Sequence, residues 1–273
     1  MSMGPKNCLL SLVAVLTLAG LGPSVASQDA VRSASGADKR VPVVLELFTS
    51  EGCSSCPPAD SFLASLDERQ PVAGAEIIAL EEHVDYWDHQ GWIDPFSAAQ
   101  WTQRQQTYAL AFPDHGVYTP ELVVDGRSGF VGSHQSDAYR AIAAAVAQPR
   151  TNISMAMKKA EKRGHEEVNV EAGRLQGAQP GDTAEVWLVI AEAGLHSAVS
   201  AGENAGRELH HAPVVRWLHK LGSAHPDAEP AFSGGADVKL EPAWKTNNLR
   251  VVALVQEKRS HRIIGSTLVR MEP

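Results

Sequence analysis

Hydrophobic positions follow two different periods along this chain, and the period changes near residue 150. Residues 43–48 form a nearly continuous apolar run with β-branched members, which predicts a strand covered on both faces. After Pro57, apolar residues recur at helical spacing as far as Leu66, and residues 77–80 form a second apolar run. The opening unit is therefore predicted to be a strand, a helix and a parallel strand, connected by a right-handed crossover.

Shorter signals complete this first part of the chain. A thin apolar stripe predicts a second helix over residues 95–110. Two apolar runs on either side of Asp125-Gly126 predict a hairpin over residues 121–131, because Asp-Gly favours tight hairpin turns. Apolar residues at helical spacing then predict a closing helix that ends before Pro149.

From residue 151 onward, short alternating runs separated by glycine and proline replace the longer elements. These runs lie at 153–157, 184–190, 249–255 and 263–269. Alternation of this kind is typical of a mostly antiparallel, sandwich-like β domain with long loops. We therefore predict an α/β domain over residues 41–149 and a β domain over residues 150–273.

The amino-terminal residues have the three-part layout of a secretory signal peptide: Lys6, an apolar stretch over residues 9–21, and small residues up to Ser27. The apolar stretch is shorter than the roughly 20 residues that a membrane-spanning helix needs, which favours cleavage of residues 1–27 over an uncleaved anchor. Residues 28–40 mix small and charged residues and are predicted to form a flexible leader. The protein is therefore expected in the periplasm or outside the cell.

The formal net charge of −8 narrows the range of partners. A negatively charged protein repels polyanions, so nucleic acid is an unsuitable ligand. No segment after the predicted signal peptide is apolar over a length that could span a membrane. We expect protein thiols, protein disulfides or a redox partner protein instead.

Cysteine usage points to one site. Signal cleavage would remove Cys8 and leave Cys53 and Cys56, which stand in the run Glu51-Gly52-Cys53-Ser54-Ser55-Cys56-Pro57-Pro58. The pair lies between a predicted strand and a predicted helix, where helix-start amides lower a thiol pKa. We predict a redox-active disulfide with one sulfur near the surface, in which Cys53 attacks and Cys56 resolves.

Three other interpretations of the cysteine pair remain open. A structural disulfide closing so short a loop would stabilise the fold by only about 1.9 kcal/mol, against about 3 kcal/mol for a fifteen-residue loop. The thiols could also stay reduced and unused. In the third interpretation, Cys53, Cys56 and His83 bind copper, because thiolates and imidazole suit that metal. We assign no metal ligands and no cofactor beyond the disulfide itself.

Further residues are predicted to surround the cysteines. His83, Asp85 and Trp87 follow the second predicted strand, where ligand-binding loops of α/β sheets lie. These side chains either border the cysteine site or only hydrogen-bond within their own loop. The polar segment 202–207 is interpreted as an inter-strand loop, with contact to the cysteine domain through Glu203 or Arg207 as the alternative.

Several motifs together resemble the secreted thioredoxin-like family catalogued as domain of unknown function 1223. The similarity covers about residues 41–270 and rests on residues 45–60, His83-Val84-Asp85-Tyr86-Trp87-Asp88, Gly91-Trp92, Tyr118-Thr119-Pro120 and Gly202-Glu203-Asn204-Ala205-Gly206-Arg207. It implies an α/β thioredoxin-like domain followed by a mostly antiparallel β domain. It also implies that Pro120 is a cis proline facing the disulfide and that Thr119 offers backbone hydrogen bonds to a substrate; an ordinary trans proline that begins a strand is the alternative.

The predicted function is a thiol-disulfide oxidoreductase in an exported, thioredoxin-like protein. Compared with thioredoxin, the chain has Ser-Ser between the cysteines, two prolines after them and no Trp directly before them. These departures leave open whether it oxidises or reduces its partner. The alternative is a non-catalytic binding protein, or a copper-handling chaperone, that uses the same cysteine face.

Overall fold

The amino-terminal half of the described chain alternates strands and helices, as its apolar pattern predicts. The computed structural model describes Met1, residues 40–112 and residues 116–271. Its first elements are β1 (Val41–Thr49), α1 (Pro57–Arg69), β2 (Ala75–His83), α2 (Ala99–Ala111), β3 (Glu121–Val124), β4 (Ser128–Val131) and α3 (Gln135–Val146). Strands β1 and β2 are parallel, and β3 and β4 form the predicted hairpin around Asp125 and Gly126.

The remaining elements are strands, apart from a single 3₁₀ turn at Thr246–Asn248. They are β5 (Ile153–Lys159), β6 (His165–Ala172), β7 (Ala184–Glu192), β8 (His196–Ala198), β9 (Glu208–His210), β10 (Val214–Ala224), β11 (Phe232–Lys239), β12 (Leu249–Glu257) and β13 (Ile263–Arg270). The alternating runs predicted β5, β7, β12 and β13.

One large sheet runs through both parts of the chain. Its eight strands have the order β13-β12-β7-β10-β2-β1-β3-β4, and all neighbours are antiparallel except β10 with β2 and β2 with β1. The fold is therefore mixed α/β with a large, mostly antiparallel sheet. The predicted boundary at 149–150 lies in the connection between α3 and β5, and β10 joins the two predicted domains where Val214 pairs with Glu81.

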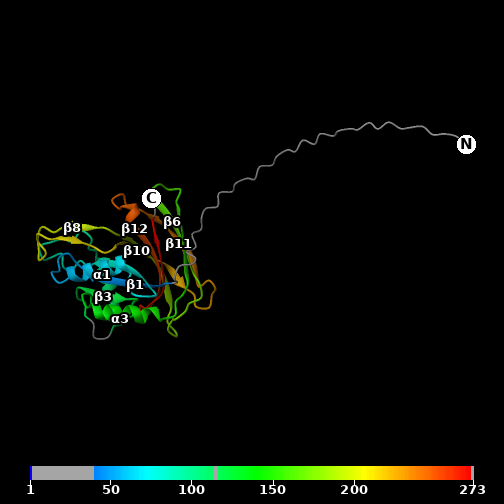
Figure 1. Cartoon of the computed structure of the whole chain (residues 1–273), viewed down its shortest axis with the longest axis horizontal. Helices are drawn as coiled ribbons and strands as arrows, with labels where there is room; N and C mark the ends of the chain where they lie inside the picture. The colour runs from blue at the N-terminus through cyan, green and yellow to red at the C-terminus, as the bar shows by residue number, and fades with distance from the viewer. Residues whose placement is uncertain (2–39, 113–115, 272–273) are drawn as a thin grey trace. The chain divides into compact units, whose positions relative to one another are not determined.

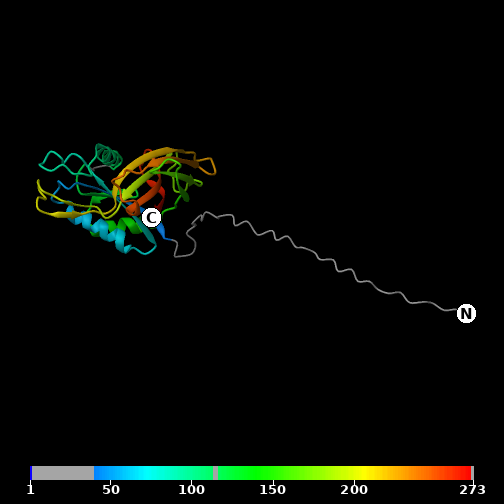
Figure 2. The same cartoon turned by 90° about the horizontal axis from the view of Figure 1, so that it is seen from above.

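Helices cover both faces of the amino-terminal end of this sheet. Figure 2 shows α1 and α3 together on one side, with α2 on the other. Alternate residues of β1 separate the two layers: Leu45 and Leu47 pack with α1 and α3, whereas Val44 packs with α2. We call these the α1 face and the α2 face.

A second, three-stranded sheet covers the carboxy-terminal end of the large sheet. Its order is β11-β6-β5, and its apolar side chains share a core with those of β7 and β12. Val168 and Val170 of β6 are buried against this core while Asn169 between them is exposed, which is the alternation of a sandwich strand.

Helix α2 begins at Ala99, four residues after the predicted start at Pro95. Residues 94–97 form a turn, in which the Asp94 carboxylate accepts the Phe96 amide and the Asp94 carbonyl accepts the Ser97 amide. The tight turn therefore replaces the first helical turn that the weak apolar stripe predicts.

The predicted signal peptide (1–27) and leader (28–40) lie outside the described residues, apart from Met1 and Arg40. Among the helices in the described part of the chain, none has the length and apolar character needed to cross a membrane.

Candidate functional site

Cys53 and Cys56 form a disulfide at the start of α1. Their Cα atoms are 5.4 Å apart, and Cys56 is the residue that caps the helix. Its carbonyl accepts the amides of Ala59 and Asp60. Both cysteines are buried, although Ser54 and Ser55 between them are exposed. The expectation that one sulfur would lie near the surface is therefore wrong for this conformation.

A loop from the carboxy-terminal half lies on the cysteine turn. The buried Asn204 side chain donates to the Glu51 carbonyl at 2.8 Å and to the Cys53 carbonyl at 3.0 Å. The Glu203 carboxylate accepts the Ser54 amide at 3.0 Å. Segment 202–207, which we call the covering loop, thus contacts the cysteine turn as the alternative interpretation of this segment stated.

The aromatic loop after β2 packs beneath the same turn. A Cβ added to Gly52 would lie 3.1 Å from the Trp87 Cβ, a tight contact that shows how closely the turn packs on Trp87. The Trp87 indole N–H donates to the Thr119 hydroxyl at 2.8 Å, and the Thr119–Pro120 bond is cis. Trp87 therefore connects the cysteine turn with the segment before β3.

A chain of histidines and carboxylates, which we call the histidine network, lies directly beside the cysteine turn. Both ring nitrogens of each histidine face carboxylate oxygens. His211 Nδ1 lies 2.9 Å from Glu81 and Nε2 lies 3.0 Å from Glu51; His83 Nε2 lies 3.1 Å from Glu81 and Nδ1 lies 2.7 Å from Asp94. All five side chains are buried.

Burial and hydrogen bonding have opposite effects on the pKa values of the groups in this network. Burial lowers the pKa of His211, but hydrogen bonds to Glu51 and Glu81 outweigh it and raise the pKa to about 9. The pKa of His83 is likewise raised, because Asp94 outweighs the effect of burial. Burial would raise the pKa of Glu81 and of Asp94, but their histidine partners lower both. The network therefore holds charged groups away from water.

The predicted neighbours of the cysteines divide between two environments. His83 belongs to the histidine network, and copper bound there would have to displace Glu81 or Asp94. Asp85 instead accepts the Thr102 hydroxyl at 2.6 Å, which fixes its loop to α2. Of the two alternatives for these residues, His83 borders the cysteine site and Asp85 acts within the loop and helix.

Asp60 is a buried carboxyl group one helical turn after Cys56. Burial and the nearby Glu81 carboxylate raise the pKa of Asp60 to about 8, against the lowering effects of the Thr49 hydrogen bond, His83 and His211. The Thr49 hydroxyl lies 2.6 Å from the Asp60 carboxyl. A cavity of about 430 Å³ borders Asp60, lined by Pro57, Asp60, Ser61 and residues 207–210. The surroundings of Asp60 therefore favour its protonated form.

The α2 face holds a second buried group of charges, which we call the arginine network. Arg104 donates through Nε to Glu46 at 2.5 Å and lies 3.5 Å from Glu82. Tyr108 also donates to Glu46, and Gln256 of β12 accepts from Arg104. Burial and then the neighbouring Glu46 raise the pKa of Glu82 well above its usual value. The permanently charged Arg104 therefore interacts with both carboxyl groups.

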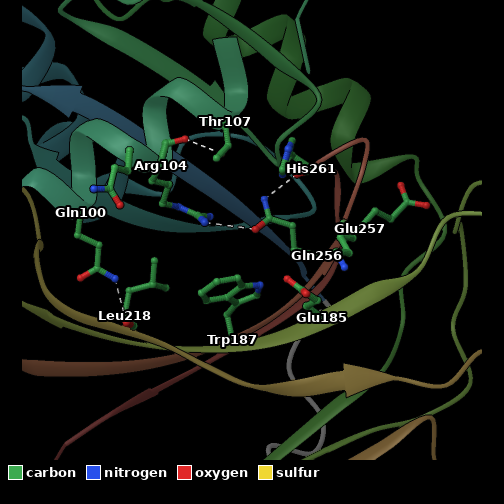
Figure 3. Close-up of a pocket in the computed structure, with 11 residues that line it drawn as sticks. Gln100, Arg104, Thr107, Glu185, Trp187, Leu218, Gln256, Glu257 and His261 are labelled. Carbon is green, nitrogen blue, oxygen red and sulfur yellow. Dashed lines mark hydrogen bonds between the residues drawn. The ribbon is translucent and has the colours of Figure 1, made fainter. Parts of the chain in front are cut away.

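A cavity of about 390 Å³ borders the arginine network (Figure 3). Gln100, Arg104 and Thr107 of α2 form one wall, and Trp187 and Leu218 face them from the large sheet. Arg104 points to Gln256, which in turn donates to the His261 carbonyl at 2.7 Å. This cavity belongs to the α2 face, whereas the disulfide begins the helix of the α1 face.

Sequence reasoning missed five residues of the site: Asp60, Glu81, Asp94, Asn204 and His211. Asn204 lies in the polar segment 202–207, where contact through the charged Glu203 or Arg207 is the alternative that the sequence offers. His211 stands next to the exposed His210 and before the apolar start of β10. A histidine directly before a buried strand is only a weak indication of a functional site. The local sequence around His211 does not reveal its partners, which lie 130 and 160 residues away.

Two solved structures share this architecture. A crystal structure of an Agrobacterium tumefaciens protein has a TM-score of 0.63 and 25% identity, covering 86% of this chain and 96% of that one. HBP35 of Porphyromonas gingivalis has a TM-score of 0.62 and 14% identity, covering 86% of this chain and 76% of its own, which shows a shared fold. No curated protein matches the sequence.

The family comparison agrees with the resemblance found in the motifs. Residues 44–256 match the family described as protein of unknown function (DUF1223). The match includes the disulfide, both buried networks and the covering loop. The chain therefore belongs to the DUF1223 family.

Proposed function

We propose that this protein is an exported, thioredoxin-like thiol-disulfide oxidoreductase that exchanges electrons with protein thiols through Cys53 and Cys56. The observation that carries the proposal is the disulfide at the start of α1, with the buried Asp60, whose pKa is raised to about 8, one turn beyond it. A helix start stabilises a thiolate, and a buried carboxyl group can exchange a proton. The central order β2-β1-β3-β4 and Pro120 before β3 support the thioredoxin-like assignment.

The exchange begins on Cys53. A partner thiolate attacks Cys53 Sγ, forms a mixed disulfide and breaks the bond to Cys56, which leaves as a thiolate at the start of α1. Asp60 lies four residues after Cys56, on the same helix face, and supplies a proton to the departing sulfur. A second partner thiolate then attacks the mixed disulfide and releases Cys53. The partner loses two electrons and both cysteines are reduced; the reverse sequence reduces a partner disulfide.

A protein partner suits the surface around the disulfide. Ile93 and Val117 are large apolar side chains that are 74% and 42% exposed. Ile93 stands between Trp92, which donates to Glu51, and Asp94, which accepts the Glu51 amide. Val117 stands two residues before Thr119. Exposed apolar residues beside a polar turn favour an extended peptide or a protein over a small polar ligand. Both sulfurs are buried, and the covering loop contacts the Ser54 amide and the Cys53 carbonyl, so we infer that this loop moves when a partner sulfur reaches Cys53.

Thiol exchange can be tested with separate cysteine variants. Wild type, Cys53→Ser and Cys56→Ser are assayed for dithiothreitol-driven insulin reduction and for oxidation of a dithiol peptide. We expect activity in wild type and at least a hundredfold loss in each variant. Cys56→Ser should additionally accumulate a mixed disulfide with the peptide at Cys53, visible by intact-mass spectrometry. Unchanged activity in Cys53→Ser, with circular dichroism confirming the fold, would contradict the proposal.

The same preparations separate this function from copper handling, which the sequence left as the alternative. Reduced wild-type protein that binds one Cu(I) per chain, loses it in Cys53→Ser and shows no insulin reduction would favour that alternative. Export can be tested by fractionating cells that express the full chain: we expect the processed protein, shortened by about residues 1–27, outside the cytoplasm.

A further inference from the structure

The histidine network contains a set of metal-ligand atoms that does not involve the cysteines. One oxygen of Glu81 faces His83 Nε2 at 3.1 Å and His211 Nδ1 at 2.9 Å. These ligand atoms all lie within 4.8 Å of one another. In a tetrahedral site with bonds of about 2.1 Å, neighbouring ligand atoms are about 3.4 Å apart. Small side-chain shifts would therefore place a metal ion between the three groups.

The surrounding carboxylates orient both histidines toward this point. His83 has its second nitrogen 2.7 Å from Asp94, and His211 has its second nitrogen 3.0 Å from Glu51. Metal-binding histidines characteristically donate their remaining ring N–H to a carboxylate or carbonyl, which fixes the tautomer and increases ligand basicity. A histidine placed for a simple salt bridge needs one carboxylate partner, but each of these has two.

Two further contacts hold the ligand set in place. The other oxygen of Glu81 accepts the Ala212 amide at 2.6 Å, so one carboxylate oxygen is anchored while the other faces both histidines. The Phe96 ring lies against both imidazoles, with ring centres 5.4 Å from His83 and 5.3 Å from His211. An apolar ring over polar ligands excludes water and strengthens the electrostatic interactions within.

Charge balance favours a divalent ion at this point. Glu51, Glu81 and Asp94 can together carry three negative charges. The two inward-facing histidine nitrogens and the Glu81 oxygen are all electron-pair donors directed at one point. A dication at that point would bind all three donors and offset two of the negative charges.

From this geometry we propose that Glu81, His83 and His211 bind Zn²⁺, with Asp94 and Glu51 positioning the two imidazoles. Two nitrogen donors and one carboxylate oxygen suit Zn²⁺, whereas Ca²⁺ and Mg²⁺ prefer oxygen ligands and Cu(I) prefers sulfur. Glu81 and His83 belong to β2, and His211 belongs to the segment that continues from the covering loop. The ion therefore connects the sheet to the segment that contacts the disulfide.

The first test uses the full chain, purified and treated with a chelator, then loaded with Zn²⁺ or Co²⁺. We expect one Zn²⁺ per chain after gel filtration, measured by atomic emission. Reduced protein loaded with Co²⁺ should show visible d–d bands of a nitrogen and oxygen site, without a near-ultraviolet thiolate charge-transfer band. A strong thiolate band, or absence of stoichiometric metal, overturns the proposal in wild type, independently of any variant.

Matched variants assign the ligands. His211→Gln should lose at least tenfold in Zn²⁺ affinity, whereas His210→Gln, at the exposed neighbouring position, should retain it. Asp94→Asn should weaken binding about 10–100-fold, as removal of an orienting partner does. The double variant Cys53→Ser with Cys56→Ser should bind Zn²⁺ as wild type does. Loss of Zn²⁺ in that double variant, or full retention in folded His211→Gln, contradicts the assignment.

Discussion

The two buried networks lie on opposite faces of the same strand, and they differ in the cation each contains. Glu81 and His83 of β2 belong to the histidine network of the α1 face, whereas Glu82 between them belongs to the arginine network of the α2 face. This division follows from the strand period of two, which sends neighbouring side chains to opposite faces. One short stretch of β2 thus supplies both networks.

The identity of the cation determines whether a network only stabilises the fold or also takes part in chemistry. Arg104 stays charged at every accessible pH and binds carboxylates through a fixed fork, so its network can only hold α2, β1 and β12 together. Histidine gains and loses protons near neutral pH and coordinates metals. The histidine network also shares Glu51 with the cysteine turn. We therefore expect substitutions on the α2 face to change stability, and those on the α1 face to change disulfide reactivity as well.

The largest effect is expected from Arg104→Met. This change leaves Glu46 and Glu82 buried without their cation, and breaking a buried ion pair in this way typically costs about 3–5 kcal/mol. Urea denaturation should show this loss in the free energy of unfolding. The rate of disulfide reduction in the folded variant should stay within twofold of wild type.

Arg140→Met provides the matched control for Arg104→Met. Arg140 is an exposed arginine on α3, paired with Asp137, and its loss should change the free energy of unfolding by less than about 1 kcal/mol. If Arg104→Met proves equally mild, or if it accelerates disulfide reduction strongly, the separation of roles between the two faces is wrong.

The distinction between local and distant signals explains what the sequence could predict. The β1-α1-β2 unit, the Asp125-Gly126 hairpin and the place of the cysteines between a strand and a helix follow from residue spacing within short windows. Asn204 and Cys53 are 151 residues apart, and β10 meets β2 through one register pair. No periodicity encodes such contacts, so the role of Asn204 within the covering loop and the pairing of His211 with Glu81 and Glu51 are visible only in the structure.

Asp60→Asn should change how stability depends on pH. Burial and Glu81 raise the pKa of Asp60 to about 8, so the folded state keeps a proton that the unfolded chain releases near pH 4. Because the folded state binds this proton more tightly than the unfolded state, the free energy of unfolding of wild type should fall as pH rises from about 4 to about 8. Relative to wild type, the variant should gain stability over this interval, with a slope approaching one proton per molecule.

Urea midpoints measured at half-unit pH steps test the slope. Asp227→Asn, a substitution at an exposed carboxylate, serves as the control and should run parallel to wild type. His83 and His211 also act on Asp60 and lower its pKa, so their loss should extend the pH interval of the slope to higher pH rather than abolish it. Parallel curves for wild type and Asp60→Asn would show that Asp60 is ionised in the folded state.

Asn204→Ala should have a moderate effect on stability and a larger effect on reactivity. The variant removes the donor to two buried carbonyls, at a cost of about 1–3 kcal/mol. Because the covering loop loses its contact with the cysteine turn, reduction of the disulfide by dithiothreitol should be accelerated about tenfold. Asn169→Ala, at an exposed site on β6, should change neither quantity. An unchanged reduction rate would show that the loop does not limit access to the sulfurs.

The smallest effect is expected from Thr119→Val, which keeps the shape of the side chain but removes the acceptor of the Trp87 indole N–H. Loss of this partly buried hydrogen bond should cost about 1 kcal/mol, and Thr246→Val at an exposed position should cost less. Trp87 packs against Gly52, so any loosening is transmitted to the turn that holds the cysteines. If the α1 face governs reactivity, we expect the rate of disulfide reduction by dithiothreitol to change two- to threefold, together with that small loss of stability. A loss of stability alone would place Thr119 with the arginine network, among residues that support the fold without affecting the disulfide.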